Sequence, residues 1–311
     1  MPSSEPRPRP IVRRAPGDVP ALTPRAWILF ALSSVIWGVP YLFIKVAVDA
    51  GLAPAFVAWS RIALAAVLLV PLAWRRGALR GLGGRAGAIA GYAACEIAVP
   101  FVLIAIGEQY ITSSLTAILV ATMPLLVALL SVCFSPSDRP SGVRLVGLVI
   151  GLGGVVLLLG VDVGGRPQEL LGAALVLAAT VGYAAAPIIV SRRLADLDPL
   201  GPVAASLVLG SVALLPAGVA TLPGRTPGPA ALGSLLVLGV ICTAWGLVVF
   251  FQLIAEAGPS RASVITYVNP LVAVVVGVLT LQEHLGAASL AGLLLILGGS
   301  WLSTRGASPT H

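Results

Sequence analysis

Ten apolar stretches, each about 18–25 residues long, constrain this chain more than any other feature of its sequence. An α-helix rises about 1.5 Å per residue, so each stretch can cross a hydrocarbon layer of roughly 30 Å. Helices also pair their own backbone groups, which lipid cannot do. We therefore predict an all-α integral membrane protein. Its transmembrane helices are expected over residues 27–48, 54–74, 86–107, 112–134, 142–161, 169–190, 199–222, 230–255, 260–281 and 287–303.

The composition supports a lipid environment. Hydrophobic residues make up 58% of the 311-residue chain and charged residues 10%, which is more apolar surface than a soluble domain can bury. The formal net charge is +7, and in a soluble protein this would suggest nucleic acid. Most basic residues, however, lie in short segments between the apolar stretches. We therefore expect the lipid bilayer as the surroundings of the chain and no nucleic-acid partner.

The distribution of basic residues predicts the orientation. If the N-terminus is cytoplasmic, only Arg166 and Arg225 lie in outer loops, and Lys45 and Arg61 lie within helices. Every other basic residue then faces the cytoplasm, which is the usual bias. We expect both termini in the cytoplasm and a multi-pass protein of the bacterial cytoplasmic (inner) membrane. Residues 1–24, which are rich in Pro and Arg, are expected to form a disordered cytoplasmic tail.

The two halves of the chain repeat each other. Ser114, Pro124 and Leu125 recur 146 residues later as Ser260, Pro270 and Leu271. This indicates a first repeat over 27–161 and a second over 169–304, with five spans each. Because five is odd, the second repeat must be inverted in the membrane. Inverted repeats with a binding site between them are typical of secondary transporters.

Small residues recur near the end of each repeat. Gly147 and Gly151 lie four residues apart in the fifth span, and Ala288 and Gly292 lie four apart in the tenth. Small residues at this spacing let helices approach closely. They predict either a packing seam between the repeat ends or a contact in a homodimer.

Several motifs resemble those of one known family. They are Trp37-Gly-Val-Pro-Tyr-Leu-Phe-Ile-Lys45, Arg61, Tyr267-Val-Asn-Pro-Leu, Glu283 and Leu297-Gly-Gly. They are similar to the motifs of the EamA family in the drug/metabolite transporter superfamily, and the resemblance covers residues 27–304. The chain departs from the family pattern where Asp138 replaces the helix-end Glu of the first repeat, and where Tyr183 follows Gly182 in place of Trp. The resemblance implies secondary transport of small molecules.

Lys45, Arg61 and Glu96 are ionisable residues that fall away from the ends of the predicted helices, where a charge costs about 2.5–3.5 kcal/mol at the helix centre. Glu96, near the midplane, is predicted either to bind a proton or a substrate ammonium group, or to pair with another helix. Arg61 is predicted either to hold a substrate carboxylate through two hydrogen bonds, or to fix a helix. Lys45 is a weaker candidate for substrate contact, because Asp49 one turn later offers a local ion pair.

Other polar and aromatic side chains within spans are candidates for lining a cavity. Asn269 precedes Pro270, which frees a carbonyl one turn earlier, so Asn269 either satisfies the backbone there or contacts substrate. The remaining candidates are Trp37, Tyr41, Tyr92, Trp245, Gln252 and Tyr267. The helix-end acids Glu108, Asp138, Glu256 and Glu283 are expected to be solvated, and Glu283 with His284 is a weaker candidate for a gate at the outer mouth.

Other chemistries lack their signatures. The sequence contains no GxxxxGK[ST], HExxH or GxSxG motif and only two histidines, so we expect no enzyme activity, no cofactor and no metal. The three cysteines fall inside apolar stretches and are expected to be buried small hydrophobes.

Together these features predict an exporter of small metabolites such as amino acids, working by alternating access, with proton coupling through Glu96 as a further hypothesis. One alternative is a broad-specificity efflux carrier for drugs or toxic cations, with Trp37, Trp245 and the tyrosines in an aromatic cage. Another is a subunit of a lipid-carrier flippase that shows no flux of its own.

Overall fold

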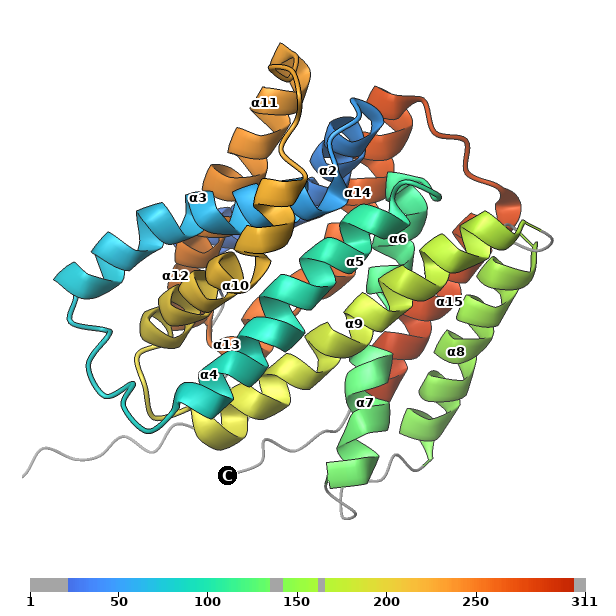
Figure 1. Ribbon diagram of the computed structural model, residues 1–311. Helices are drawn as coiled ribbons and strands as arrows, with labels where there is room; N and C mark the ends of the chain where they lie inside the picture. The colour runs from blue at the N-terminus through green and yellow to red at the C-terminus, as the bar shows by residue number, and fades with distance from the viewer. Residues whose placement is uncertain (1–21, 135–141, 162–165, 305–311) are drawn as a thin grey trace, which may run out of the picture.

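The computed structural model describes residues 22–134, 142–161 and 166–304 (Figure 1). Within these ranges, ten helical segments are long and apolar enough to cross a membrane, which confirms the predicted number of spans. The division between the third and fourth spans falls at residues 108–112. Nearly all of the predicted N-terminal tail, and Asp138, lie outside the described residues.

Each repeat contributes five spans, some of them built from consecutive helices. The first repeat contains α1 (Pro24–Gly38), α2 (Pro40–Asp49), α3 (Pro54–Arg75), α4 (Ala86–Tyr92), the π-helix η1 (Ala93–Ala98), α5 (Val99–Gly107), α6 (Ser113–Val120), α7 (Met123–Phe134) and α8 (Val143–Val161). The second contains α9 (Pro167–Arg193), α10 (Leu200–Ala220), α11 (Pro229–Leu236), the π-helix η3 (Val237–Trp245), α12 (Gly246–Ala257), α13 (Pro259–Ala262), α14 (Ile265–Leu281) and α15 (Ala287–Thr304).

The third span of each repeat contains a π-helix in its middle. In the first repeat η1 lies between α4 and α5, and in the second η3 lies between α11 and α12. A π-helix shifts the backbone hydrogen bonds by one residue, and such stretches are frequent at functional sites. The paired occurrence therefore directs attention to side chains on η1 and η3.

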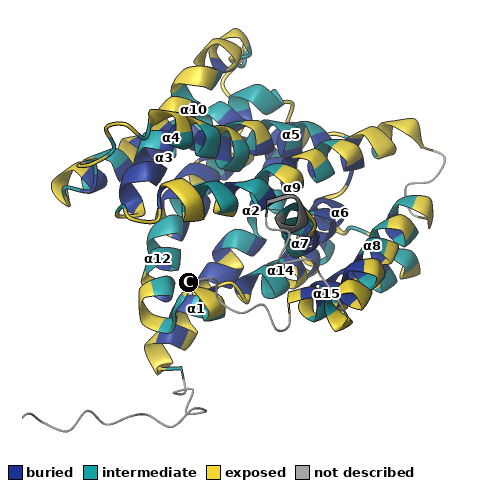
Figure 2. Cartoon of the chain, turned by 90° about the horizontal axis from the view of Figure 1, so that it is seen from below, coloured by how far each residue is buried: buried dark blue, intermediate teal, exposed yellow. Residues whose placement is uncertain are grey.

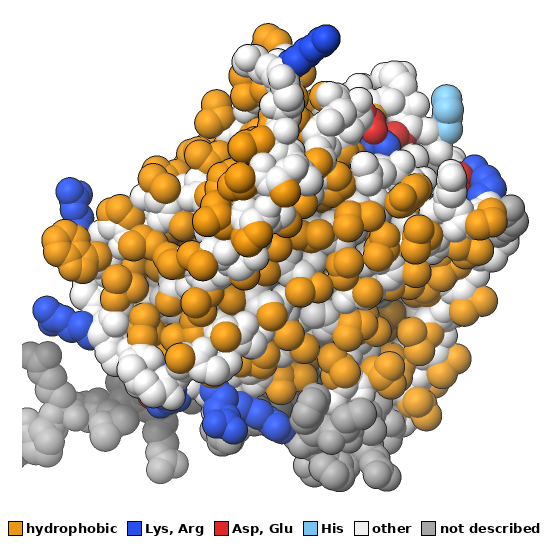
Figure 3. Space-filling model, viewed as in Figure 1, with side chains coloured by type: hydrophobic (Ala, Val, Ile, Leu, Met, Phe, Trp, Pro, Cys, Tyr) orange, Lys and Arg blue, Asp and Glu red, His pale blue; other side chains and the backbone are white. Residues whose placement is uncertain are grey.

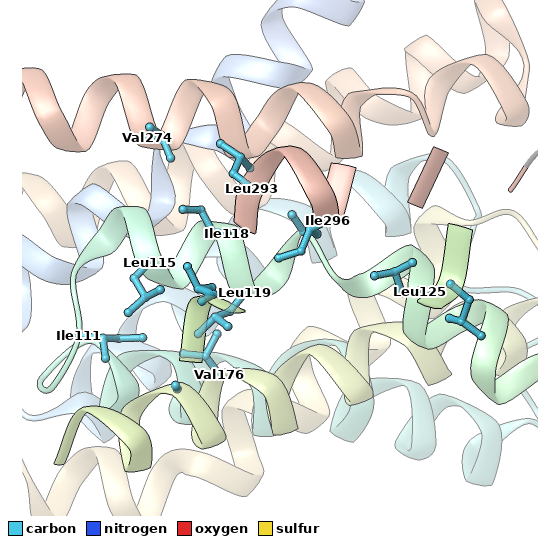
Figure 4. Close-up of a cluster of buried hydrophobic side chains, with 13 residues drawn as sticks. Ile111, Leu115, Ile118, Leu119, Leu125, Val176, Val274, Leu293 and Ile296 are labelled. Carbon is cyan, nitrogen blue, oxygen red and sulfur yellow. The ribbon is translucent and has the colours of Figure 1, made fainter. Parts of the chain in front are cut away.

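Apolar side chains from both repeats form the core. Figure 4 shows one cluster, in which Ile118 and Leu119 of α6 lie near Val176 of α9, Val274 of α14 and Ile296 of α15. In lipid, such clusters stabilise the fold through close packing, because leaving the bilayer for the bundle removes no water from an apolar group. The cluster thus joins the inner surfaces of the two repeats.

The outer surface is apolar. Val67, Val156, Leu279 and Leu294 are each about 70% exposed, and exposed residues lie mainly on the outward sides of the helices (Figure 2). Figure 3 shows hydrophobic side chains across the middle of one face, with Lys and Arg side chains at its margins. This distribution fits a bundle that is surrounded by hydrocarbon and meets water at its two ends.

Glycines form a seam between α8 and α15, the last spans of the two repeats. A Cβ atom added to Gly147 would lie 2.5 Å from the backbone nitrogen of Ser303, and one on Gly154 would lie 2.8 Å from Leu295 Cβ. Gly292 faces α8 in turn, where an added Cβ would lie 3.2 Å from Gly154 O. Gly147 and Gly292, two of the small residues noted in the sequence, therefore make their close contacts within one chain.

Enlarging a seam glycine should destabilise the bundle. We expect Gly147→Leu to lower the midpoint of thermal unfolding in detergent by several degrees or to prevent folding, because overpacking against backbone costs about 1–3 kcal/mol or more. Gly153→Leu is the matched control: it lies on the same helix, and an added Cβ would meet nothing within 4 Å. Equal effects of the two substitutions would contradict a seam that depends on close backbone approach.

Candidate functional site

Arg61 of α3 lies inside the bundle, with 8% of its surface exposed. Its Nε donates a hydrogen bond to Thr243 Oγ1 of η3 at 2.7 Å, and its Cζ lies 3.9 Å from the centroid of the Phe101 ring in α5. Thr243 Oγ1 donates in turn to Leu238 O at 2.8 Å. The two terminal nitrogens, Nη1 and Nη2, form no hydrogen bond with the described part of the chain. Side chains from both repeats thus hold Arg61 in place, and its two terminal nitrogens remain able to donate hydrogen bonds to a ligand.

Several polar groups lie close enough to Arg61 to interact with it electrostatically. They are Tyr41 of α2, Glu108 after α5, Tyr183 of α9 and Cys242 of η3. Tyr41 is among the candidates from the sequence. Tyr183 is not, although a phenol inside an apolar span was the available signal. Residues of α2, α9 and η3, and of α5 and the connection after it, therefore surround this one guanidinium of α3.

Glu96 lies in η1 and is half-buried. It interacts electrostatically with Tyr92 at the end of α4 and with Tyr183 of α9. No hydrogen bond or ion pair joins its carboxyl group to another described residue, so a structural ion pair, one of its two predicted roles, has no partner there. Because Tyr183 interacts with both Glu96 and Arg61, the structure brings these two ionisable residues into one region.

The tryptophans do not form a common cage. Trp37 Nε1 donates to Cys242 O at 3.1 Å, and its ring lies 4.6 Å from that of Phe250, so it packs α1 against η3 and α12. Trp245 is 48% exposed, and Gln252, seven residues later on the same span, is also exposed. The hydrogen bond and the ring contact of Trp37 are those of a packing residue.

Asn269 and Tyr267 belong to a different part of the bundle. With its amide nitrogen turned toward carbonyl groups, Asn269 donates to Ser34 O at 3.2 Å and to Ile265 O at 2.9 Å. It therefore joins α1 to α14 just before Pro270 interrupts the helix hydrogen bonds. The hydroxyl of Tyr267 lies 3.0 Å from Thr304 Oγ1, near the end of α15. Neither residue is among the groups that interact with Arg61.

Lys45 forms the ion pair with Asp49 that the sequence spacing predicted. Its Nζ lies 3.0 Å from Asp49 Oδ1 and donates a second hydrogen bond to the backbone oxygen of Glu108 at 2.9 Å. These contacts lie at the end of the bundle where α2 and α5 terminate. Lys45 is therefore a residue that joins these two helices.

The expectation that Glu108 is solvated is wrong. Its side chain is 0% exposed, and neither carboxyl oxygen has a hydrogen-bond partner among the described residues. Burial raises the pKa of Glu108 well above the ordinary range of a glutamate, and this effect outweighs the opposing effect of Lys45. The helix-end position suggested water, but the neighbouring helices cover it.

Glu283 is not simply solvated either. Its carboxylate accepts four hydrogen bonds at 2.5–3.0 Å, from the backbone nitrogens and the hydroxyls of Ser113 and Ser114. These two residues begin α6, where unpaired N–H groups and the helix dipole favour an anion. Glu283 follows α14, so this contact, which we name the latch, joins the second repeat to the first.

A groove of about 830 Å³ lies elsewhere, between α4 and α9. Its lining includes Gly84, Arg85, Gly91, Ile189 and Arg193, and none of the candidates from the sequence. Arg85 there pairs with Asp196 at 2.8 Å. The groove thus belongs to the end of the bundle opposite the latch.

Removing the charge of Glu283 should weaken the latch. We expect Glu283→Gln to lower the free energy of unfolding by about 2 kcal/mol, because it loses charge-assisted hydrogen bonds at a helix N-terminus. The measurement is chemical or thermal unfolding in detergent, with the exposed neighbour His284→Gln as control. A double-mutant cycle with Ser114→Ala should give a coupling energy, and strictly additive effects would contradict the latch.

The raised pKa of Glu108 predicts a pH-dependent stability. Below about pH 4.3 the carboxyl is protonated in both folded and unfolded chains, and its contribution is full. As the pH rises toward the folded-state pKa, the unfolded chain releases the proton first, and the free energy of unfolding falls by about 1.4 kcal/mol per pH unit. Glu108→Gln should therefore gain thermal stability over the wild type as the pH rises from 4 to 8. Parallel curves would refute this, and exposed Glu256→Gln is the control.

The chain matches the model of the EamA-like transporter family twice, over residues 25–160 and 170–305. One solved crystal structure aligns with a TM-score of 0.63 at 18% identity, covering 90% of this chain and 96% of that chain, which indicates a shared fold.

Relatives of similar length are named as transporters. An uncharacterized transporter of Archaeoglobus fulgidus is 27% identical, over 90% of this chain and 99% of the relative. The uncharacterized inner membrane transporter YedA of Escherichia coli is 30% identical, over 82% of each chain. The uncharacterized transporter YvbV of Bacillus subtilis is 28% identical, over 88% of this chain and 89% of the relative. With both repeats matched by the family, this chain belongs to the EamA-like transporter family and is a multi-pass membrane transporter.

Proposed function

We propose that this transporter exports small carboxylate-bearing metabolites, such as amino acids, by alternating access. The observation that carries the proposal is the Arg61 guanidinium, which is buried, fixed through Nε by Thr243, and left with two terminal nitrogens unpaired by the described chain. A guanidinium fork binds a carboxylate through two parallel hydrogen bonds, and it does so most strongly away from water. A purely lipophilic cation would gain nothing from this charge.

Glu96 is proposed to receive the ammonium group of such a substrate. It lies in η1, half-buried, and without a hydrogen-bonding or charged partner among the described residues. Tyr183 interacts electrostatically with both Glu96 and Arg61, which supports a site with a positive and a negative end. A zwitterion matches this arrangement better than a simple anion does.

The proposed orientation places both termini in the cytoplasm of a bacterial inner membrane. Arginines of the described chain gather at the end where α1 begins and α15 terminates; they are Arg25, Arg75, Arg76, Arg80, Arg85, Arg144, Arg192, Arg193 and Arg261. Arg166 and Arg225 lie at the opposite end. This bias supports the orientation. The proposed function is assigned to a single chain, because the glycine faces that could serve a homodimer are occupied between α8 and α15.

Counterflow in proteoliposomes tests the substrate class. We expect saturable exchange of labelled amino acids, and we expect Arg61→Lys to reduce it at least tenfold, because lysine keeps the charge but loses the two-pronged contact. Arg225→Lys, in a loop at the bundle end, is the matched control. Glu96→Gln should impair amino acids more than their deaminated analogues.

Other outcomes would redirect the proposal. Flux of cationic drugs without flux of carboxylates would support a broad-specificity efflux carrier instead. A folded preparation that transports neither carboxylates nor cationic drugs would favour the alternative of a flippase subunit.

A further inference from the structure

Glu108 is the one acidic side chain that is completely buried in the described part of the chain. It lies in the short connection between α5 and α6, immediately before the helix start that the latch holds. Both of its carboxyl oxygens lack hydrogen-bond partners among the described residues. A buried ionised carboxylate without hydrogen bonds is very unfavourable, whereas a protonated one is tolerated.

The charges around Glu108 already balance without it. The charged or titratable groups that interact with it electrostatically are Tyr41, Lys45 and Asp49 of α2, Arg61 of α3, and Glu283 beyond α14. Two of these are cations and two are carboxylates. Lys45, the nearest candidate counter-ion, pairs with Asp49 and donates to the backbone oxygen of Glu108 rather than to its carboxyl group. An ionised Glu108 would therefore add an uncompensated negative charge.

We propose that Glu108 is the proton-binding residue of this carrier, holding a proton while the latch end is closed and exchanging it with water when that end opens. The carboxyl O–H bond then breaks, the proton passes to a water molecule, and a carboxylate remains; closing reverses the step. This role rests on the proposed function for its meaning in transport, but the protonation state can be measured without any substrate.

The same geometry couples the proton to the substrate. An ionised Glu108 would repel a substrate carboxylate at Arg61. It would also compete with that carboxylate for electrostatic attraction to the guanidinium. Conversely, a bound carboxylate neutralises Arg61 and leaves the surroundings of Glu108 more negative, so the proton is held more tightly. Proton and carboxylate therefore bind cooperatively, and by linkage each strengthens the other by the same factor. In the proposed direction of export the proton leaves the cell together with the substrate, so the outward gradient of the metabolite drives the step.

Glu96 differs from Glu108 in the features that matter here. It is half-buried rather than sealed, and no member of the Lys45–Asp49 pair interacts with it among the described contacts. Its predicted proton role is therefore a rival that the same experiment can separate.

Infrared difference spectra of the full chain in lipid nanodiscs test the proposal directly. At pH 7 we expect the wild-type minus Glu108→Gln spectrum to contain the carbonyl stretch of a protonated carboxylic acid. A carboxylate band in its place would overturn the proposal. Glu108→Asp is a second variant, which should shift the acid band rather than remove it, and Glu96→Gln should leave that band in place.

Transport measurements then test the coupling. With a labelled amino acid that shows counterflow, the apparent affinity of the wild type should fall by up to about tenfold per pH unit above the Glu108 pKa, and that dependence should be absent in Glu108→Gln. If Glu96→Gln alone abolished the dependence, Glu108 would not be the coupling residue. Absence of all flux would count against the proposed function, and the infrared result would still decide the protonation state of Glu108.

Discussion

The absence of water from the bilayer core determines most of what this structure does with its polar groups. Each buried donor, acceptor or charge must find its partner inside the chain, because an unpaired one costs several kcal/mol in hydrocarbon. Helices meet this demand for the backbone. Side chains add further hydrogen bonds where helices meet, as Asn269 does by donating to Ser34 O of α1 and to Ile265 O one turn earlier in α14. The same demand makes the unpaired fork of Arg61 and the unpaired carboxyl of Glu108 informative.

The two π-helices show how backbone geometry serves the central site. In η3, Thr243 Oγ1 donates to the carbonyl of Leu238, five residues earlier, while it accepts from Arg61 Nε. The carbonyl of Cys242 in the same stretch accepts from Trp37 Nε1. The altered helix therefore presents a hydroxyl and a carbonyl to side chains of the first repeat. In η1 the corresponding stretch carries Glu96. Thr243 and Glu96, two polar residues of the site, thus lie on the same unusual kind of element, one in each repeat.

The spans could be predicted because the length of an apolar run is a local property of the sequence. The repeat could be predicted because the same motifs occur in both halves of the chain. The environments of the charged residues could not. Glu108 and Glu283 both follow the end of a helix, and sequence position suggests water for each. One is sealed by neighbouring helices and the other accepts four hydrogen bonds from α6. The contacts of Glu283 join residues about 170 positions apart, and the residue that donates to the backbone of Glu108 lies 63 positions earlier, so no local pattern encodes either environment. Tyr183 is different, because a phenol inside an apolar span was a local signal that could have identified it.

The contacts between the repeats differ in how readily they can separate. The seam between α8 and α15 relies on backbone approach at Gly147, Gly154 and Gly292, and parting it would leave voids that neither lipid nor water fills well. The latch relies on hydrogen bonds of Glu283 at the end of the bundle. If that end opens, water can replace each of these bonds, so the net cost is modest. A carrier that alternates between two states needs one kind of contact to hold its halves together and the other to change. The packed glycines suit the first role. The hydrogen bonds of Glu283, which water could replace, suit the second, and Glu108 lies in the connection that leads into the helix held by the latch.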